Sequence, residues 1–140
     1  DAEIAFALAE RGGTTIWIGP DSIAAATARQ PGIGVQVHAL SADPLRRARI
    51  GRADRIGDPL HGEIRRLAAL HDARYVVFPV ELVYDADREG GGRVGLWTVL
   101  LDARTGFILW AQTVYAEPGP PDAAAALAAV AATLARRLVP

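Results

Sequence analysis

The sequence predicts a two-layer α/β sandwich of the α+β class, in which helices pack on a mixed β-sheet. Three observations support this class. In several segments apolar residues recur every three or four positions, which is the helical period. From Arg74 onward they recur at every second position, which is typical of strands. Three such strands follow one another through short connections, so the second half is predicted to form a three-stranded antiparallel meander that helices cover.

The amino-terminal third predicts a helix, a strand and a second helix. The segment from Ala2 to Arg11 has a helical period and ends at Gly12-Gly13, residues that commonly close helices. The segment Thr14 to Ile18 is β-branched and aromatic, so we expect a buried strand there. Asp21 is then the expected cap of a helix from Ser22 to Gln30.

The middle of the chain is less regular. Val35 to Leu40 alternates weakly and predicts a short strand or an extended loop. Asp43-Pro44 and Asp58-Pro59 each pair a capping carboxylate with a proline at the first helical position. The first pair predicts a short turn or helix to about Ile50. The second predicts a helix from Pro59 to His71, whose core-facing stripe is Leu60, Ile64, Leu67 and Ala68.

The second half predicts the meander and a last helix. The first strand begins at Arg74 and has one apolar face, and Pro79 places it at a sheet edge or a bulge because proline donates no backbone hydrogen bond. The next strands are expected over Arg93 to Leu101 and Phe107 to Ala116, and a helix over Asp122 to Leu138. The apolar face of the first strand is Val76, Phe78, Val80, Leu82 and Tyr84.

The amino-acid composition limits the functions that the protein can have. The chain has 140 residues, of which 51% are hydrophobic and 22% charged, so we expect residues 1–140 to form a single domain. A net charge of -1 provides no field that would draw it to nucleic acid or anionic lipid. The absence of cysteine excludes disulfides, thiolate nucleophiles and cysteine-based metal sites. Because the sequence opens inside a helix-like segment, it leaves open that an upstream strand, leader or anchor is missing from it.

No motif for catalysis or for a cofactor stands out. His38, His61 and His71 are the only histidines, and the last two would lie about 15 Å apart along one helix, too far to share a metal. Neither serine lies in a nucleophile elbow, and the absence of lysine excludes a phosphate-binding P-loop. We therefore expect a protein that is not an enzyme and has no metal or cofactor. An enzyme remains the third hypothesis, since Glu63, Glu81 and Asp102 could converge in space without a motif.

A weak calcium loop is the first candidate binding site. Asp85, Asp87 and Glu89 place oxygens at alternate positions, and Gly90 is the sixth residue, as in the first half of a calcium loop. The twelfth residue is Leu96, where the bidentate glutamate should stand. We prefer a solvated hairpin tip, with weak calcium binding as the alternative.

An arginine-rich stretch is the second candidate. The densest positive segment is relieved only by three aspartates, and it predicts either a solvated face or a surface that docks anions or a partner. The alternative function, a small-ligand or anion-binding domain, depends on this stretch. Its members are Arg46, Arg47, Arg49, Arg52 and Arg55.

Two motifs in residues 60–140 resemble a known family. The step Ala73-Arg74-Tyr75 leads from a helix into a strand, and the turn Asp102 to Gly106 (D-x-x-T-G) joins two strands of the meander. This order resembles the cell-envelope α/β domains of the TolB amino-terminal, CsgG and LpoB type. The resemblance implies a periplasmic or outer-membrane-associated protein, often lipid-anchored upstream, that works by binding other envelope proteins. It transfers no catalytic residue.

The leading hypothesis is therefore a non-enzymatic protein-interaction module of the bacterial cell envelope, as an accessory or assembly subunit of a larger complex. The resemblance implies membrane contact only through an upstream anchor. Self-association through an unpaired sheet edge is a further option that the sequence leaves open.

Overall fold

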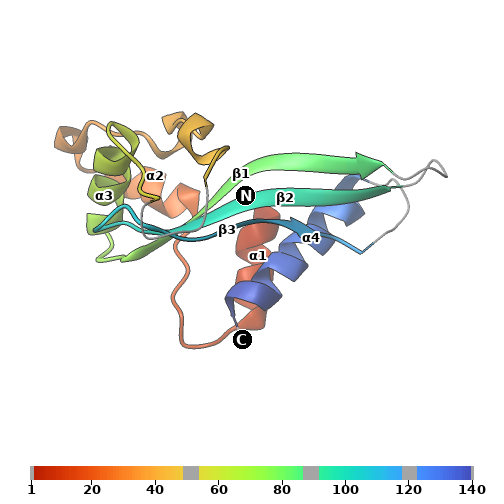
Figure 1. Cartoon of the computed structure of the whole chain (residues 1–140). Coiled ribbons are helices and arrows are strands. Elements are labelled where there is room, and N and C mark those ends of the chain that lie inside the picture. Colours follow the sequence, from red (N-terminus) through yellow and green to blue (C-terminus); the bar gives the residue numbers. More distant parts are fainter. Residues whose placement is uncertain (1, 49–53, 87–91, 118–122, 140) are drawn as a thin grey trace. The chain divides into compact units, whose positions relative to one another are not determined.

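The computed structural model describes residues 2–48, 54–86, 92–117 and 123–139, and it has an α/β fold (Figure 1). Strands β1 (Tyr75–Ala86), β2 (Gly92–Asp102) and β3 (Ile108–Tyr115) form an antiparallel sheet in the order β1-β2-β3. The predicted meander is thus confirmed. The α-helices of the described residues are α1 (Ala2–Arg11), α2 (Pro20–Ala28), α3 (Leu60–Ala69) and α4 (Ala123–Leu138).

The chain divides into two compact units. Unit 1 comprises Asp1–Trp17, Glu81–Trp97 and Thr113–Pro140, and unit 2 comprises Ile18–Val80 and Thr98–Gln112. All three strands contribute residues to both units. The expectation of a single domain stays a prediction.

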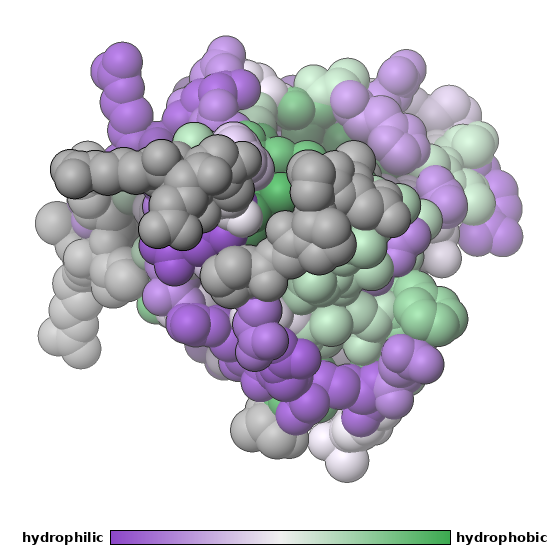
Figure 2. All heavy atoms as spheres, turned by 90° about the vertical axis from the view of Figure 1, so that its right-hand side faces the viewer, coloured by the Kyte–Doolittle hydropathy of each residue, from purple (hydrophilic) through white to green (hydrophobic). Residues whose placement is uncertain are grey.

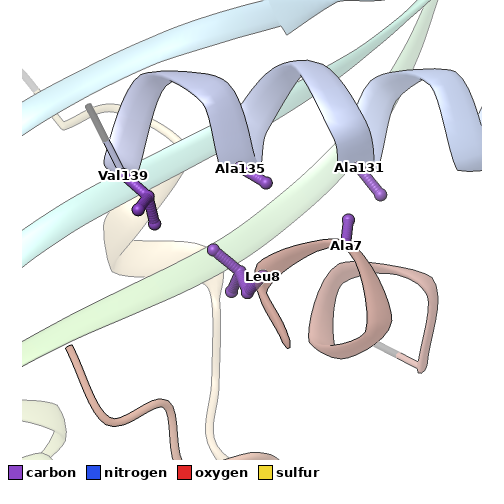
Figure 3. Close-up of a cluster of buried hydrophobic side chains, with 5 residues drawn as sticks. All are labelled: Ala7, Leu8, Ala131, Ala135 and Val139. Carbon is purple, nitrogen blue, oxygen red and sulfur yellow. The ribbon is translucent and has the colours of Figure 1, made fainter. Parts of the chain in front are cut away.

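In unit 1, α1 packs against α4 through small side chains (Figure 3). The Nε of Arg11 donates a hydrogen bond of 2.9 Å to the carbonyl oxygen of Val139, one residue beyond α4. This contact joins the carboxyl ends of the two helices, so they run parallel, and it satisfies a carbonyl that a helix end leaves without a partner. The buried cluster between the helices consists of Ala7, Leu8, Ala131, Ala135 and Val139.

In unit 2, α3 buries the predicted stripe. Leu60, Ile64, Leu67 and Ala68 are all buried. The helix begins at Leu60, and Asp58 caps its first turn, since its Oδ1 accepts the backbone N–H of Gly62 at 3.0 Å. The predicted carboxylate does bond to the first turn, but Pro59 occupies the cap position and is not the first helical residue as predicted.

The expected strand over Thr14 to Ile18 is wrong, and the sheet is consequently antiparallel rather than mixed. These residues form an irregular connection between α1 and α2, and Ile16 is 87% exposed. A β-branched run fits a half-buried sheet surface only where a partner strand exists. Helix α2 also begins earlier than expected, with Gly19 as its cap, so Asp21 lies in its first turn.

The irregular middle contains short 3-10 turns. Val37–Ala39 is such a turn, so neither a strand nor a fully extended loop forms there. Pro31–Ile33 and Asp43–Leu45 are two more, and residues 49–53 lie outside the described residues. After Asp43-Pro44 the sequence predicts a short turn or a helix to about Ile50, and the described residues show the turn.

Strand β1 lies at the edge of the sheet, as Pro79 predicted, but its apolar face is not a core face. None of the residues of β1 is buried. The predicted apolar residues Leu82 and Tyr84 are 53% and 60% exposed. Its side chains are covered less than those of β2 and of the other edge strand, β3, both of which contain buried residues.

Candidate interaction surface

The D-x-x-T-G turn is built around the carboxylate of Asp102, which is buried within unit 2. Its Oδ1 accepts the backbone N–H groups of Arg104 at 2.9 Å and Thr105 at 3.1 Å. Its Oδ2 accepts the Nε of Arg74 at 2.9 Å. The turn closes at Gly106, whose φ of 76° lies in the left-handed region that favours glycine. The motif is therefore explained by local structure.

Hydrogen bonds stabilise the negative charge of the Asp102 carboxylate. Burial disfavours the ionised carboxylate, but the hydrogen bonds from Arg74 and from the backbone of Thr105 and Arg104 outweigh it, so the pKa of Asp102 is lowered. The hydrogen bond to Asp102 in turn raises the pKa of Arg74. The Arg74 side chain is 59% exposed, so the arginine of this ion pair faces solvent while the carboxylate is buried.

Two more side chains, those of Arg55 and His61, contact the same turn. Both Nε and Nη2 of Arg55 donate to the carbonyl of Thr105, and the guanidinium lies 4.7 Å from the centre of the Phe107 ring. The Nε2 of His61 lies 3.2 Å from the carbonyl oxygen of Ala103, which requires a proton on that nitrogen. These polar groups are satisfied within the chain, so we regard the turn as a structural element.

The predicted arginine surface is divided among separate contacts. Arg55 belongs to the turn just described, and the Nε of Arg46 lies 3.3 Å from a carboxylate oxygen of Asp43. Arg47 is exposed, whereas Arg49 and Arg52 lie outside the described residues. Among the described members of the stretch, Arg46 and Arg55 thus have different partners, and anion binding stays a prediction.

The predicted calcium loop is described only at its first residue. Asp85 lies near the end of β1, and its Oδ2 is 3.3 Å from the Nη2 of Arg93. Asp87 and Glu89 lie outside the described residues. The proposed calcium site therefore stays a prediction.

The carboxylates considered for catalysis have different surroundings. Asp102 is held by the donors of its turn, Glu63 is half-buried on α3, and Glu81 is exposed on β1. Across the described ranges, no three histidine, aspartate or glutamate side chains are grouped closely enough to hold a metal ion. The Nε2 of His71 is buried and has no hydrogen-bond partner among the described residues.

A shallow groove of about 360 Å³ lies between α1 and α4 in unit 1. Two of its arginines already make contacts within the chain: Arg11 with the Val139 carbonyl, and Arg136 with the hydroxyl of Thr133 at 2.8 Å. An anion bound there would compete with these contacts. The residues that line the groove are Ala7, Glu10, Arg11, Ala132, Ala135 and Arg136.

The outer edge of β1 is a surface on which two large apolar side chains, those of Leu82 and Tyr84, are exposed. Within unit 1 it comprises Glu81 to Ala86, which we call the β1 outer edge. Here Leu82 and Tyr84 project two positions apart and therefore from one face of the strand, while Glu81 and Asp85 project from the other. Figure 2, viewed toward the end of the sheet where β1 ends, shows hydrophobic surface exposed among hydrophilic residues.

Sequence reasoning placed Leu82 and Tyr84 on a packed face and so missed this surface. A signal was present, because proline and inward- or outward-pointing charges on an otherwise apolar strand are how natural sheets mark an edge. Pro79, Glu81 and Asp85 make up that pattern.

Comparisons with known proteins identify no relative. No protein-family model, no curated protein and no solved structure matches this chain. The fold and the surface therefore define the class of protein only as an α/β domain with an exposed apolar sheet edge. Within the described residues, no helix has both the length and the apolar character needed to cross a membrane.

Proposed function

We propose that this protein is a non-enzymatic protein-interaction module. The observation that carries the proposal is the exposed apolar character of β1, where Leu82 is 53% and Tyr84 is 60% exposed. Large exposed apolar patches mark interaction sites in soluble proteins. Aromatic residues such as Tyr84 are also enriched where proteins bind one another.

The surroundings of the buried carboxylate Asp102 favour an interaction module over an enzyme. The buried carboxylate Asp102 is held by hydrogen bonds from Arg74 and the turn, which lowers its pKa. General acid or base catalysis works best with a pKa near the operating pH, which such an environment opposes. The groups that donate hydrogen bonds to Asp102 are Arg74 and the backbone of its own turn, as expected for a carboxylate with a structural role.

We also propose that the module acts in the bacterial cell envelope, as an accessory or assembly subunit. This part rests on the resemblance of residues 60–140 to envelope domains of the TolB amino-terminal type, carried by Ala73-Arg74-Tyr75 and the turn from Asp102 to Gly106. Fractionation of cells of the native host tests it. Recovery of the protein with envelope fractions is expected, and recovery only with the cytoplasm would remove the envelope assignment.

Site-specific photocrosslinking in the native host tests the interaction itself. A benzophenone amino acid is placed at Leu82 or Tyr84, with exposed Arg65 on α3 as the control position. We expect both β1 positions to give the same discrete protein adduct and the control to give none. Absence of an adduct, or the same adducts from all three positions, would overturn the proposal.

A further inference from the structure

Helix α1 is joined to the rest of the chain by a segment without hydrogen bonds. From Gly13 to Ile18 the chain forms neither helix nor strand, and among the described residues no hydrogen bond joins this segment to another part. We call it the α1 linker. The boundary between the two units falls inside it, after Trp17, so α1 packs in unit 1 whereas the next helix, α2, belongs to unit 2. Helix α1 is therefore held in place mainly by its packing on α4 and by the hydrogen bond from Arg11.

The contacts between α1 and α4 do not require both helices to belong to one molecule. They consist of the buried cluster of alanine, leucine and valine side chains and of the hydrogen bond from Arg11 to the carbonyl of Val139. A second copy of the chain offers the same side chains and the same carbonyl. Exchange of an identical element between two copies is a low-cost route to a dimer, because each contact that opens within one copy forms again between the copies.

Two glycines provide the hinge that such an exchange needs. Gly12 and Gly13 have φ values of 65° and 91° where α1 meets its linker. Glycine has no Cβ, so it changes between this left-handed region and extended backbone at little cost. The linker can therefore pass from the conformation that returns α1 to α4 of its own chain to an extended one that reaches a second copy, while both helices keep their structures.

The α1 linker has the composition of a strand but lacks a strand partner within one chain. Every residue from Thr14 to Ile18 is β-branched or aromatic. Yet Ile16 is 87% exposed, and the indole N–H of Trp17 is buried with no hydrogen-bond acceptor among the described residues. A buried donor without an acceptor is unfavourable. The closed form, in which α1 packs on α4 of its own chain, thus leaves the strand-forming capacity of the linker unused.

Exchange of α1 supplies the missing strand partner. In a dimer in which each copy gives α1 to the other, the two linkers cross in opposite directions about a two-fold axis, as antiparallel strands do. With the axis at Ile16, Thr14 of one copy lies opposite Ile18 of the other, and Thr15 lies opposite Trp17. Aromatic and β-branched side chains form favourable pairs across strands, and the linker has no charged residue that would repel its copy. A second copy is therefore the partner to which the linker is complementary.

We infer that two copies of this chain exchange α1, so that each α1 packs on α4 of the other copy and the two α1 linkers pair as antiparallel strands. The strand that the sequence predicts over Thr14 to Ile18 forms in this dimer and not in the closed form. Because the linker keeps α1 close to its own α4, the closed form prevails at low concentration and the exchanged dimer at high concentration. The inference goes beyond the proposed interaction function and does not involve β1.

Disulfide trapping tests the exchange, because the chain contains no cysteine of its own. Ala7 of α1 and Ala131 of α4 point toward one another (Figure 3). One chain carries Ala7→Cys and another carries Ala131→Cys, and the two are refolded together at about 0.2 mM in a glutathione redox buffer. A disulfide between the two chains requires α1 of one on α4 of the other. We expect its yield to exceed that of the same mixture at about 2 µM by about tenfold or more.

Two further variants calibrate the trapping. A single chain with both Ala7→Cys and Ala131→Cys should form the disulfide internally at about 2 µM, which verifies that the two positions are within reach. In the control pair Ala5→Cys replaces Ala7→Cys, because Ala5 is exposed on α1. The control pair should give at most about one tenth of the interchain disulfide. Equal yields from the two pairs, or no interchain disulfide between the Ala7→Cys and Ala131→Cys chains, would overturn the inference.

The variant Ile16→Asp tests the pairing of the linkers. Because Ile16 is exposed in the closed form, the substitution should leave that form folded, which circular dichroism verifies. In the exchanged dimer it sets two carboxylates near the two-fold axis, and like charges destabilise a strand pair. We expect the association constant from sedimentation equilibrium to fall about tenfold or more, whereas Ile16→Val, which remains β-branched and apolar, should change it less than about twofold. Equal association constants for the two variants would contradict the inference.

The combined results separate exchange from other forms of association. A dimer that Ile16→Asp weakens but that gives no interchain disulfide would be a side-by-side pair in which α1 stays on its own chain, and this outcome would also overturn the inference. The proposed interaction function is tested separately by the crosslinks at Leu82 and Tyr84, so either proposal can fail without the other.

Discussion

Asp102 links its own turn to the residue before β1 through one buried side chain. It accepts hydrogen bonds from its own turn and from Arg74, which immediately precedes β1. The backbone N–H of Ala103 also donates to the Arg74 carbonyl, so the turn is connected to β1 by both backbone and side chain. The D-x-x-T-G motif is thus explained without reference to any partner.

Replacing this carboxylate should change both stability and its dependence on pH. Because the folded-state pKa of Asp102 is lowered, the unfolded chain binds more protons near pH 4, and the contribution of this group is lost as pH falls through the folded-state pKa. We expect Asp102→Asn to cost about 1–3 kcal/mol at pH 7 and to reduce the acid-induced loss of stability. Urea unfolding from pH 2.5 to 7 measures both effects.

Exposed Glu117 provides the control, since Glu117→Gln should alter neither the stability at pH 7 nor its acid dependence by a comparable amount. An Asp102→Asn variant that follows the parental stability profile from pH 7 to pH 2.5 would contradict the role given to the carboxylate.

Gly106 should be equally sensitive for a steric reason. A Cβ at this position would lie 3.2 Å from ring atoms of His61, and its φ of +76° disfavours side chains. We expect Gly106→Ala to lower the free energy of unfolding by about 1–2 kcal/mol. Gly57→Ala is the matched control, because no atom lies within 4 Å of a Cβ there. Chemical denaturation compares the two, and equal losses would contradict this prediction.

At the level of elements, the α1–α4 contact depends on small side chains. Ala7, Ala131 and Ala135 lie where the two helices meet (Figure 3). Alanine at such positions lets helices approach closely, and a larger side chain must displace its neighbours.

Two alanines of α4 provide a matched comparison of this packing. Ala135 is 1% exposed, and Ala128 on the same helix is exposed. Since alanine-to-leucine changes have similar helix propensities at both sites, a difference reports packing alone. We expect Ala135→Leu to destabilise the protein by about 1–3 kcal/mol and Ala128→Leu to change stability by less than about 0.5 kcal/mol. Thermal unfolding followed by circular dichroism would reveal equal effects if the contact were unimportant.

The elements also show what local sequence can predict. The core stripe of α3 and the meander were predicted because periodicity and turn residues act over a few positions. Local sequence did not predict the absence of a strand at Thr14–Ile18, because a strand depends on a partner elsewhere in the chain. The exposure of Leu82 and Tyr84 was missed for the same reason: alternation shows that two side chains share a face, but not whether anything covers that face.

For the whole molecule, the question is whether the two units unfold together. All three strands pass through both units, so loss of one unit would interrupt every strand of the other. We therefore expect a single cooperative transition, in agreement with the prediction of one domain.

Tryptophan positions allow a direct measurement. Trp17 lies in unit 1 and Trp110 in unit 2, so a Trp97→Phe, Trp110→Phe variant reports on unit 1 and a Trp17→Phe, Trp97→Phe variant on unit 2. In each variant the fluorescence midpoint in urea should coincide with that from circular dichroism. A fluorescence transition that precedes the circular dichroism transition in either variant would show that the units unfold separately.

The hydrogen bond from Arg11 to the carbonyl of Val139 joins residues 128 positions apart, and the core of unit 1 depends on this pairing of early and late helices. During synthesis α1 leaves the ribosome long before α4 exists. At common elongation rates the delay is on the order of ten seconds. Throughout that interval Leu8 has no α4 to cover it, so the nascent chain is expected to rely on chaperones until α4 has been translated.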